Sequence, residues 1–348
     1  MSAIRWARIS VICFSLPAFP GQSVVPSAAS PDVNRRIVLD VVVTGKSEKR
    51  VSGLEEQDFT VVDNKEPQKL VSFQAVERPT DDPPVKIILL VDRVNTSFGS
   101  AGIAREQTKK FLRQNGGKLD LPVSMIFFSD SGTTGVEKPT RDGNALAAAL
   151  DESDSGLRTT GRSQGIYGAV DRLQMSLRTL NAVAGNEVNN PGRKLLIWLS
   201  AGWPMLAGPR VQLSSKDQQE VFNAIVAASA ALRQARIALY SIDTVGVSGG
   251  LRSNYYLEFV KGVKTARQAQ AGNLALPVIA YQTGGRVLYS SNDIAEQIAR
   301  CAVDATSYYV LSFDSPPADG PNEYHALDVK IGKPGLTART RTGYYAQP

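Results

Sequence analysis

Histidine and cysteine are nearly absent from this sequence. Among its 348 residues there is one histidine, His325, and there are two cysteines, Cys13 and Cys301. Zinc sites rich in histidine or cysteine cannot be built from so few side chains, and a Ser–His–Asp triad would need His325 itself. No nucleophile has a general base beside it in the sequence, so a hydrolase is the weakest hypothesis considered. We expect a protein that is not an enzyme.

Long apolar runs are also missing, apart from a short one near the N-terminus. Arg5 and Arg8 precede the run ISVICFSLPAF, and the small residues PSAAS follow it. This layout is typical of a secretory signal peptide, and the run is too short to span a bilayer. We predict a signal peptide over residues 1–30, cleaved between Gly21 and Pro31, and therefore a secreted or periplasmic protein. A buried first helix is the alternative.

Strong charge of one sign is absent as well. The formal net charge is +6, but no block of Lys or Arg marks an arm for nucleic acid or for a membrane surface. Removal of the signal peptide would leave Cys301 as the single cysteine, so the exported fold would have no internal disulfide. With 43% hydrophobic residues, the chain can bury a substantial core. We expect a soluble globular protein without a nucleic-acid partner.

The chain changes its pattern twice. Residues 34–78 and 307–346 carry short β-type runs separated by turn clusters, such as IVLDVVV, DFTVVD and SYYVLSFD. Between these flanks, residues 85–305 alternate apolar strands with amphipathic helices. The main expected strands are KIILLV, PVSMIFF, KLLIWL, IALYSI and GGRVLYS, and the expected helices lie at 101–113, 145–150, 163–180, 217–235 and 291–305.

Repeated strand–helix units predict an α/β fold with a doubly wound, mostly parallel sheet. Neither flanking β region has enough strands to be stable alone. We therefore predict that residues 34–78 and 307–346 form one small antiparallel β domain, into which the α/β domain at 85–305 is inserted. Functional groups of such a sheet gather at the carboxyl ends of the strands, so the residues after each strand are the candidates for a site.

Several stretches resemble a known family. An apolar strand ending in Asp, a strand ending FFSD, a long helix and a strand ending LSAG resemble, in this order, a von Willebrand factor type A domain. LLVDRVNTSF, ALYSIDTVG and the two β flanks are similar to the type A-related proteins of acidobacteria, over about residues 34–346. The resemblance implies a type A, Rossmann-like fold in an exported bacterial protein that binds or adheres rather than catalyses. It implies no particular ligand.

Type A domains that bind metal use Asp-x-Ser-x-Ser after the first strand, a Thr from a later loop and an Asp after the fourth strand. Carried over by this resemblance, Asp92 matches the first Asp and Thr96 can replace the second Ser. Val94 stands at the first Ser position and Ala201 at the second Asp position. Mg²⁺ and Ca²⁺ require oxygen ligands, so we predict a degenerate site with weak binding at most. The candidate ligands, the last three being alternatives for the Thr, are Asp92, Thr96, Thr159, Thr160 and Ser163.

Asp92 has two other possible roles: to accept hydrogen bonds from backbone N–H groups where the next helix begins, or to contact a partner. A long loop at 245–273, rich in aromatic and basic residues, leaves the same edge of the sheet and is either a binding loop or a helical excursion. We predict that a protein or a cell-surface polymer binds this edge. The predicted contacts are Asp92, Asn95, Thr96, Ser97, Trp203, Asp243, Tyr255, Tyr256 and Phe259.

Three further side chains have simpler interpretations. Cys301 lies on the apolar face of its helix, which predicts a buried, inert thiol. His325 shares the strand parity of Leu327 and Val329, which predicts a structural histidine or one at the rim of the sheet. Trp203 is either a core residue or an exposed binding aromatic, a type enriched at hot spots.

Overall fold

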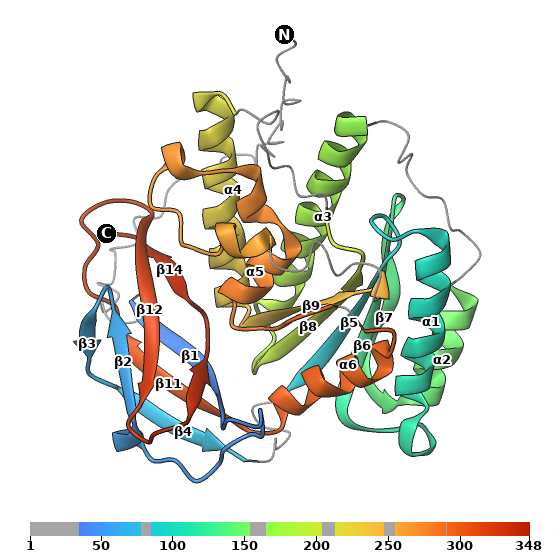
Figure 1. Cartoon of the computed structure of the whole chain (residues 1–348), viewed down its shortest axis with the longest axis horizontal. Coiled ribbons are helices and arrows are strands. Elements are labelled where there is room, and N and C mark those ends of the chain that lie inside the picture. The colour runs from blue at the N-terminus through green and yellow to red at the C-terminus, as the bar shows by residue number, and fades with distance from the viewer. Residues whose placement is uncertain (1–34, 78–84, 154–164, 204–212, 247–254, 290) are drawn as a thin grey trace, which may run out of the picture.

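A six-stranded sheet lies at the centre of the larger part of the molecule (Figure 1). The computed structural model describes residues 35–77, 85–153, 165–203, 213–246, 255–289 and 291–348. The strand order is β10-β9-β8-β5-β6-β7, and β7 (Gly132–Asp142) pairs antiparallel with β6 at one side. The parallel strands are β5 (Lys86–Asp92), β6 (Lys118–Ser129), β8 (Lys194–Ser200), β9 (Ile237–Asp243) and β10 (Val287–Leu288). The predicted mostly parallel α/β fold is confirmed.

Helices cover both faces of this sheet. Ile87 and Leu89 of β5 belong to the core on one face, and Ile88 and Leu90 belong to the core on the other. A strand covered on both faces needs no polar side, which explains the uninterrupted run KIILLV. The helices are α1 (Phe98–Leu112), α2 (Gly143–Glu152) and α6 (Ile294–Ala302) on the first face, and α3 (Gly165–Glu187), α4 (Ser215–Gln234) and α5 (Leu276–Gln282) on the second.

Some elements differ from the sequence expectations. The turn-rich stretch GTTGVEKPTRD forms β7, in which Gly135 has a φ of 150° and a Cβ there would lie 2.0 Å from the carbonyl oxygen of Met125. Helix α5 lies in a stretch for which the sequence predicted neither a helix nor a strand. Short 3₁₀ helices also occur: η1 (Glu56–Asp58), η2 (Gln114–Gly117), η5 (Tyr255–Phe259), η6 (Ala266–Gln268), η7 (Ala271–Leu274) and η8 (Val303–Ala305). No helix in the described ranges has the length and apolar composition needed to cross a bilayer.

The two β flanks pair with each other in two small antiparallel sheets. One sheet has the order β13 (Thr337–Arg339), β1 (Arg36–Thr44), β11 (Tyr308–Asp314), β4 (Ser72–Val76), and the other has the order β14 (Gly343–Ala346), β12 (Glu323–Ile331), β2 (Phe59–Asp63), β3 (Glu66–Gln68). Leu39 and Phe313 of the first sheet share a core with Val61 and Val329 of the second. The flanks thus stabilise each other; the domain boundaries stay a prediction.

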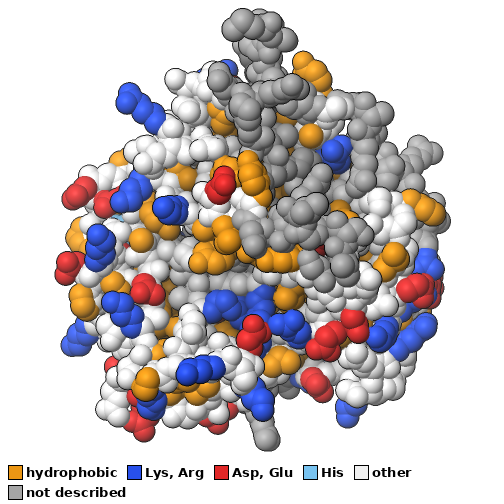
Figure 2. Space-filling view, in the orientation of Figure 1, with side chains coloured by type: hydrophobic (Ala, Val, Ile, Leu, Met, Phe, Trp, Pro, Cys, Tyr) orange, Lys and Arg blue, Asp and Glu red, His pale blue; other side chains and the backbone are white. Residues whose placement is uncertain are grey.

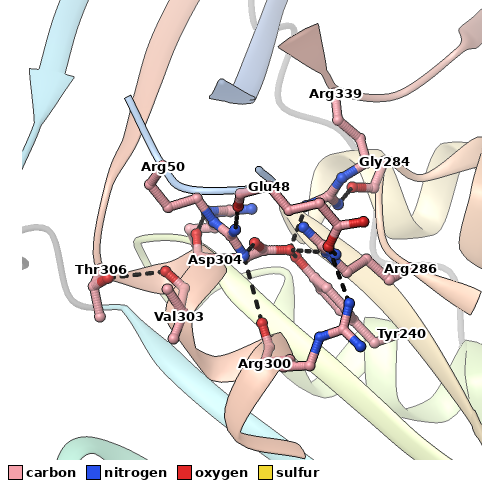
Figure 3. Close-up of polar contacts among 11 residues, drawn as sticks. Glu48, Arg50, Tyr240, Gly284, Arg286, Arg300, Val303, Asp304, Thr306 and Arg339 are labelled. Carbon is pink, nitrogen blue, oxygen red and sulfur yellow. Dashed lines mark hydrogen bonds and ion pairs between the residues drawn. The ribbon is translucent and has the colours of Figure 1, made fainter. Parts of the chain in front are cut away.

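A buried carboxylate joins the small sheets to the parallel sheet (Figure 3). Asp304 of η8 is paired with Arg50, which follows β1, and with Arg339 of β13. It is also paired with Arg286 at 3.1 Å and accepts a hydrogen bond from Tyr240 of β9 at 3.0 Å. Burial raises the pKa of Asp304, but the arginines lower it below its usual value. One carboxylate therefore binds groups from both parts of the molecule.

A second carboxylate extends this network towards solvent. Glu48 is paired with Arg286 at 3.2 Å and with Arg300 at 3.0 Å, and these partners lower its pKa. Figure 2 shows Lys and Arg side chains gathered in the middle of the visible face, between the small sheets and the parallel sheet. The junction is thus rich in guanidinium groups.

Candidate functional site

The carboxyl ends of β5, β8 and β9 lie side by side at one edge of the parallel sheet. Val91 is level with Leu199, and Ser200 is level with Asp243. The residues that follow these strands therefore meet at the same edge, as expected for a parallel sheet. We call this region the strand-end edge and define it by residues 92–97, 200–203 and 243–246.

Asp92 is buried at the strand-end edge, and both of its carboxylate oxygens are engaged. Its exposed fraction is 1%. Oδ1 accepts hydrogen bonds from the backbone N–H groups of Val94 and Asn95, each at 2.9 Å. Oδ2 accepts from the side chain of Asn95 at 2.8 Å and from Trp198 and Ser200 at 2.9 Å each. Burial raises the pKa of Asp92, and these hydrogen bonds oppose that effect.

The surroundings of Asp92 do not fit a metal ion. Mg²⁺ and Ca²⁺ need several oxygen lone pairs directed at one point, whereas Asp92 is surrounded by N–H and O–H donors. The indole of Trp198 can only donate, and the side chain of Val94 packs in the core. Ala201 offers a methyl group, and its backbone N–H donates to Thr96 Oγ1 at 3.4 Å. Across the described ranges, no three His, Cys, Asp or Glu side chains are grouped to hold a metal. The candidate ligands Thr159, Thr160 and Ser163 lie outside the described residues.

The residues after Asp92 build the loop rather than present themselves to a partner. Asn95 also donates to Ser176 Oγ at 2.9 Å, which ties this loop to α3. Asn95 and Thr96 are buried, so their predicted role in direct contact, like that of Asp92, does not agree with the structure. Ser97 is the N-cap of α1, and its hydroxyl accepts the backbone N–H of Ser100 at 3.2 Å. The backbone donors to Asp92 thus precede the helix instead of belonging to it.

Most of the predicted binding aromatics are core residues. Trp203 packs edge-to-face against Trp198, with ring centroids 4.8 Å apart, and is buried. Of its two predicted roles, it is therefore a core residue and not an exposed binding aromatic. Tyr256 and Phe259 are buried in a small cluster with residues of α5, which corrects their prediction as contact residues. Tyr255, on the same 3₁₀ helix, is exposed. The difference arises because a 3₁₀ helix turns successive side chains in different directions.

The segment 255–274 is a packed helical excursion and not an open loop. It contains the 3₁₀ helices η5, η6 and η7, and it contributes Val263, Ala269 and Leu274 to the core on the α4 face of the sheet. The hydroxyl of Tyr345 donates to the carbonyl oxygen of Val263 at 2.9 Å, which joins the segment to β14. Residues 247–254 lie outside the described residues. Asp243, the last residue of β9, is half-buried and accepts the backbone N–H of Val245 at 2.8 Å.

Apolar side chains that the sequence analysis did not select are exposed around the strand-end edge. Phe98, the first residue of α1, is 74% exposed, and Tyr167 is exposed in the first turn of α3. Glu187, the last residue of α3, bonds Lys86 where β5 starts, and Ser176 bonds Asn95 at the strand-end edge, so the first turn of α3 projects beyond that edge. Val245 after β9 and Leu257 of η5 are exposed as well. Together with Tyr255 they form the apolar rim: Phe98, Tyr167, Val245, Tyr255 and Leu257.

His325 and Cys301 lie in the interior, as predicted. His325 Nδ1 lies 2.9 Å from Asp63 Oδ1, and the hydroxyl of Tyr344 donates to Asp63 Oδ2 at 2.6 Å. All three side chains are buried in the small sheets, which is a structural arrangement. Cys301 is free and buried, and burial raises the pKa of its thiol, so the reactive thiolate is disfavoured.

No family model and no curated protein matches this sequence. The pilus adhesin SpaC from Lactobacillus rhamnosus GG aligns with a TM-score of 0.37 and 13% identity, over 84% of this chain and 49% of that one. The manganese-loaded TRAP protein of Plasmodium vivax aligns with a TM-score of 0.34 and 10% identity, over 78% and 96% of the two chains. The SpRpn10 VWA domain aligns with a TM-score of 0.28 and 11% identity, over 64% and 97%. The chain spans about half the length of SpaC. Similarity this low assigns no ligand, partner or activity to this chain.

Proposed function

We propose that this chain is an exported, non-catalytic module that binds a protein or a cell-surface polymer through its strand-end edge. The observation that carries the proposal is the exposure of the apolar rim around that edge. Aromatic side chains are enriched at binding hot spots, and three of these exposed side chains are aromatic. Adhesion to a partner surface is the function class that this arrangement supports best.

The rim is supported by a rigid base. Asp92 connects the end of β5 to Trp198 and Ser200 of β8, and Asn95 connects the same loop to α3. Buried hydrogen bonds thus hold the loop that leads to Phe98 and α1, and one of them reaches Ser176 in the middle of α3, the helix that carries Tyr167. A pre-organised surface loses less conformational entropy on binding than a mobile one.

Export rests on the N-terminal pattern of Arg5, Arg8 and the short apolar run, and it remains a proposal. Metal-dependent adhesion with altered ligands is the competing hypothesis. Because donors surround Asp92, we expect titration with Mg²⁺, Mn²⁺ or Ca²⁺ to release no heat and to leave the melting temperature unchanged. A saturable heat that is lost in the Asp92→Asn variant would favour the metal-dependent alternative.

Substitution of the rim tests the proposal. The double variant Phe98→Ser/Tyr255→Ser removes two exposed aromatics from different elements of the rim. Each hot-spot truncation costs at least about 1–2 kcal/mol of binding, so we expect capture of partners from an envelope extract to fall at least about tenfold. Captured proteins and polymers would be quantified against the unmodified chain, and circular dichroism would show that the variant is folded.

A matched control is available on the same molecule. Val71 and Tyr281 are exposed apolar residues outside the strand-end edge, and Val71→Ser/Tyr281→Ser changes surface polarity by a similar amount. This control should capture the same partners as the unmodified chain. If the rim variant and the control bind equally well, the strand-end edge is not the binding surface and the proposal is wrong.

A further inference from the structure

A small cavity between α4, α5 and the C-terminal strands is lined by an arginine that has no counter-charge. The cavity has a volume of about 20 Å³, and Arg341, which lines it, is 8% exposed. Among the described residues, no side chain or carbonyl oxygen forms a hydrogen bond or an ion pair with the guanidinium of Arg341, which is largely buried. A buried charge is almost always paired, because an unpaired one loses its hydration without replacement.

The charges around Arg341 increase this imbalance. Burial and the neighbouring Arg233 lower the pKa of Arg341 to about 10, and the carboxylate of Asp40 only partly opposes them. Asp40 is itself paired with Arg236 at 2.5 Å. One carboxylate thus acts on two arginines, Arg236 and Arg341, while Arg233 adds a further positive charge beside Arg341.

A second unsatisfied donor lines the same cavity. The hydroxyl of Thr342 is buried and has no hydrogen-bond partner in the described structure. Ser229 of α4 and Gln282 of α5 also line the cavity, while the amide of Asn273 already donates to the carbonyl oxygen of Phe259 at 3.0 Å. Among the described residues, the buried hydroxyl of Thr342 lacks a partner, and the neighbouring Arg341 side chain carries a positive charge that no carboxylate pairs, so the two side chains together favour an acceptor with negative charge.

We propose that this cavity binds one small monovalent anion of halide size, held by the guanidinium of Arg341 and the hydroxyl of Thr342. A cavity of about 10–15 Å³ admits one water molecule. The volume of about 20 Å³ therefore admits one monatomic ion and excludes sulfate and phosphate. A water molecule would satisfy the hydroxyl but would leave the positive charge uncompensated. The site lies apart from the strand-end edge and is independent of the function proposed above.

Thermal unfolding at constant sodium concentration tests this site. Sodium chloride replaces sodium gluconate stepwise, because gluconate is too large for the cavity. An anion that binds the folded state stabilises it by mass action, so we expect the melting temperature to rise by about 2–4 °C between 1 and 100 mM chloride. Broadening of the ³⁵Cl NMR signal by the protein gives a direct measure of binding.

Variants assign the effect to this cavity. In Arg341→Met the chloride dependence and the line broadening should be lost, and Thr342→Val should weaken both. Arg178→Gln, a change at an exposed arginine of α3, should leave both intact. If Arg341→Met does not fold, the chloride response of Thr342→Val is compared with that of the unmodified chain instead. The proposal is overturned if the unmodified chain shows neither effect, or if both cavity variants keep the full response to chloride.

Discussion

At the scale of single residues, Asp92 illustrates what the sequence predicts and what it cannot. Its position after an apolar strand correctly placed it at the strand-end edge. The apolar residues at Val94 and Ala201 predicted a degenerate metal site, and that remains a prediction. The side-chain donors Trp198 and Ser200 come from a strand more than 100 residues away. Trp198 and Ser200 reach Asp92 because of the register between β5 and β8, and this register cannot be predicted from a single sequence.

Replacing the Asp92 carboxylate tests whether it acts as a hydrogen-bond hub. In Asp92→Asn the amide N–H₂ would face Trp198 and Ser200, which also donate, so donors would oppose each other. We expect the free energy of unfolding to fall by about 2–4 kcal/mol in urea titrations. Asp130→Asn, at an exposed carboxylate near the same edge, should change it by less than about 0.5 kcal/mol. Equal stability of both variants would contradict the hub role.

Lys194 gives a prediction about pH. It is 1% exposed where β8 begins and donates to the carbonyl oxygens of Glu187 and Asn190. Burial lowers its pKa to about 8, below the value of about 10.4 in an unfolded chain. Between these values the unfolded chain binds the proton more tightly, so the contribution of Lys194 to stability rises as the pH rises from about 8 to 10.

The contribution of Lys194 is measured as a difference between two proteins, because the titration of Cys301 changes the free energy of unfolding in the opposite direction. Burial raises the pKa of its thiol, so the folded state retains a proton that the unfolded chain releases at high pH, and stability falls there. The difference in the free energy of unfolding between the unmodified chain and Lys194→Met should change by about 1–3 kcal/mol in favour of the unmodified chain from pH 8 to pH 10. A constant difference would show that the pKa of Lys194 is not lowered.

At the scale of elements, the long periodic helices were predictable and the short ones were not. The apolar stripe of α3, with Leu173 and Leu180, is clear in the sequence and is buried as expected. The 3₁₀ helices η5 to η7 show no such period, because three to five residues are too few to reveal one. Their aromatic residues were therefore predicted together as partner contacts, although the structure places Tyr255 outside and Phe259 inside.

Two residues of η5, Phe259 and Tyr255, are expected to affect different properties, the first stability and the second binding. Phe259→Ala should lower the free energy of unfolding by about 3–4 kcal/mol, because it leaves a cavity beneath α5. Tyr255→Ser should change it by less than about 0.5 kcal/mol, because its ring is exposed, yet it should weaken partner capture. Urea titration and capture assays on both variants measure the two effects. Equal stability of the two variants would contradict the packing of η5 against α5.

At the scale of the whole molecule, the pairing of the two flanks was predictable from a simple count. Each flank has too few strands to bury a face, so they had to meet. The junction around Asp304 was not predictable, because its arginines come from segments up to 289 residues apart in number, from Arg50 to Arg339. In a sequence, charged residues that are so far apart cannot be distinguished from ordinary exposed charges.

Asp304 should hold the molecule together as one cooperative unit. Asp304→Asn leaves Arg50, Arg286 and Arg339 without a buried counter-charge, so we expect a loss of about 3–5 kcal/mol in the free energy of unfolding. Glu48→Gln, at the solvent side of the same network, should cost less than about 1 kcal/mol. Calorimetry should show one transition for the unmodified chain. Two separate transitions would show that the junction does not couple the parts.

The pairing of the flanks also sets an order of events during synthesis. Strand β1 leaves the ribosome first, but its neighbour β11 begins about 260 residues later. At about 5–20 residues per second, β1 and β2 wait roughly 15–50 s for their partners. During that time their edges are open to pairing with other chains. Completion of the small sheets therefore requires synthesis through β14, and a chain that stops before β11 keeps β1 without its sheet partners.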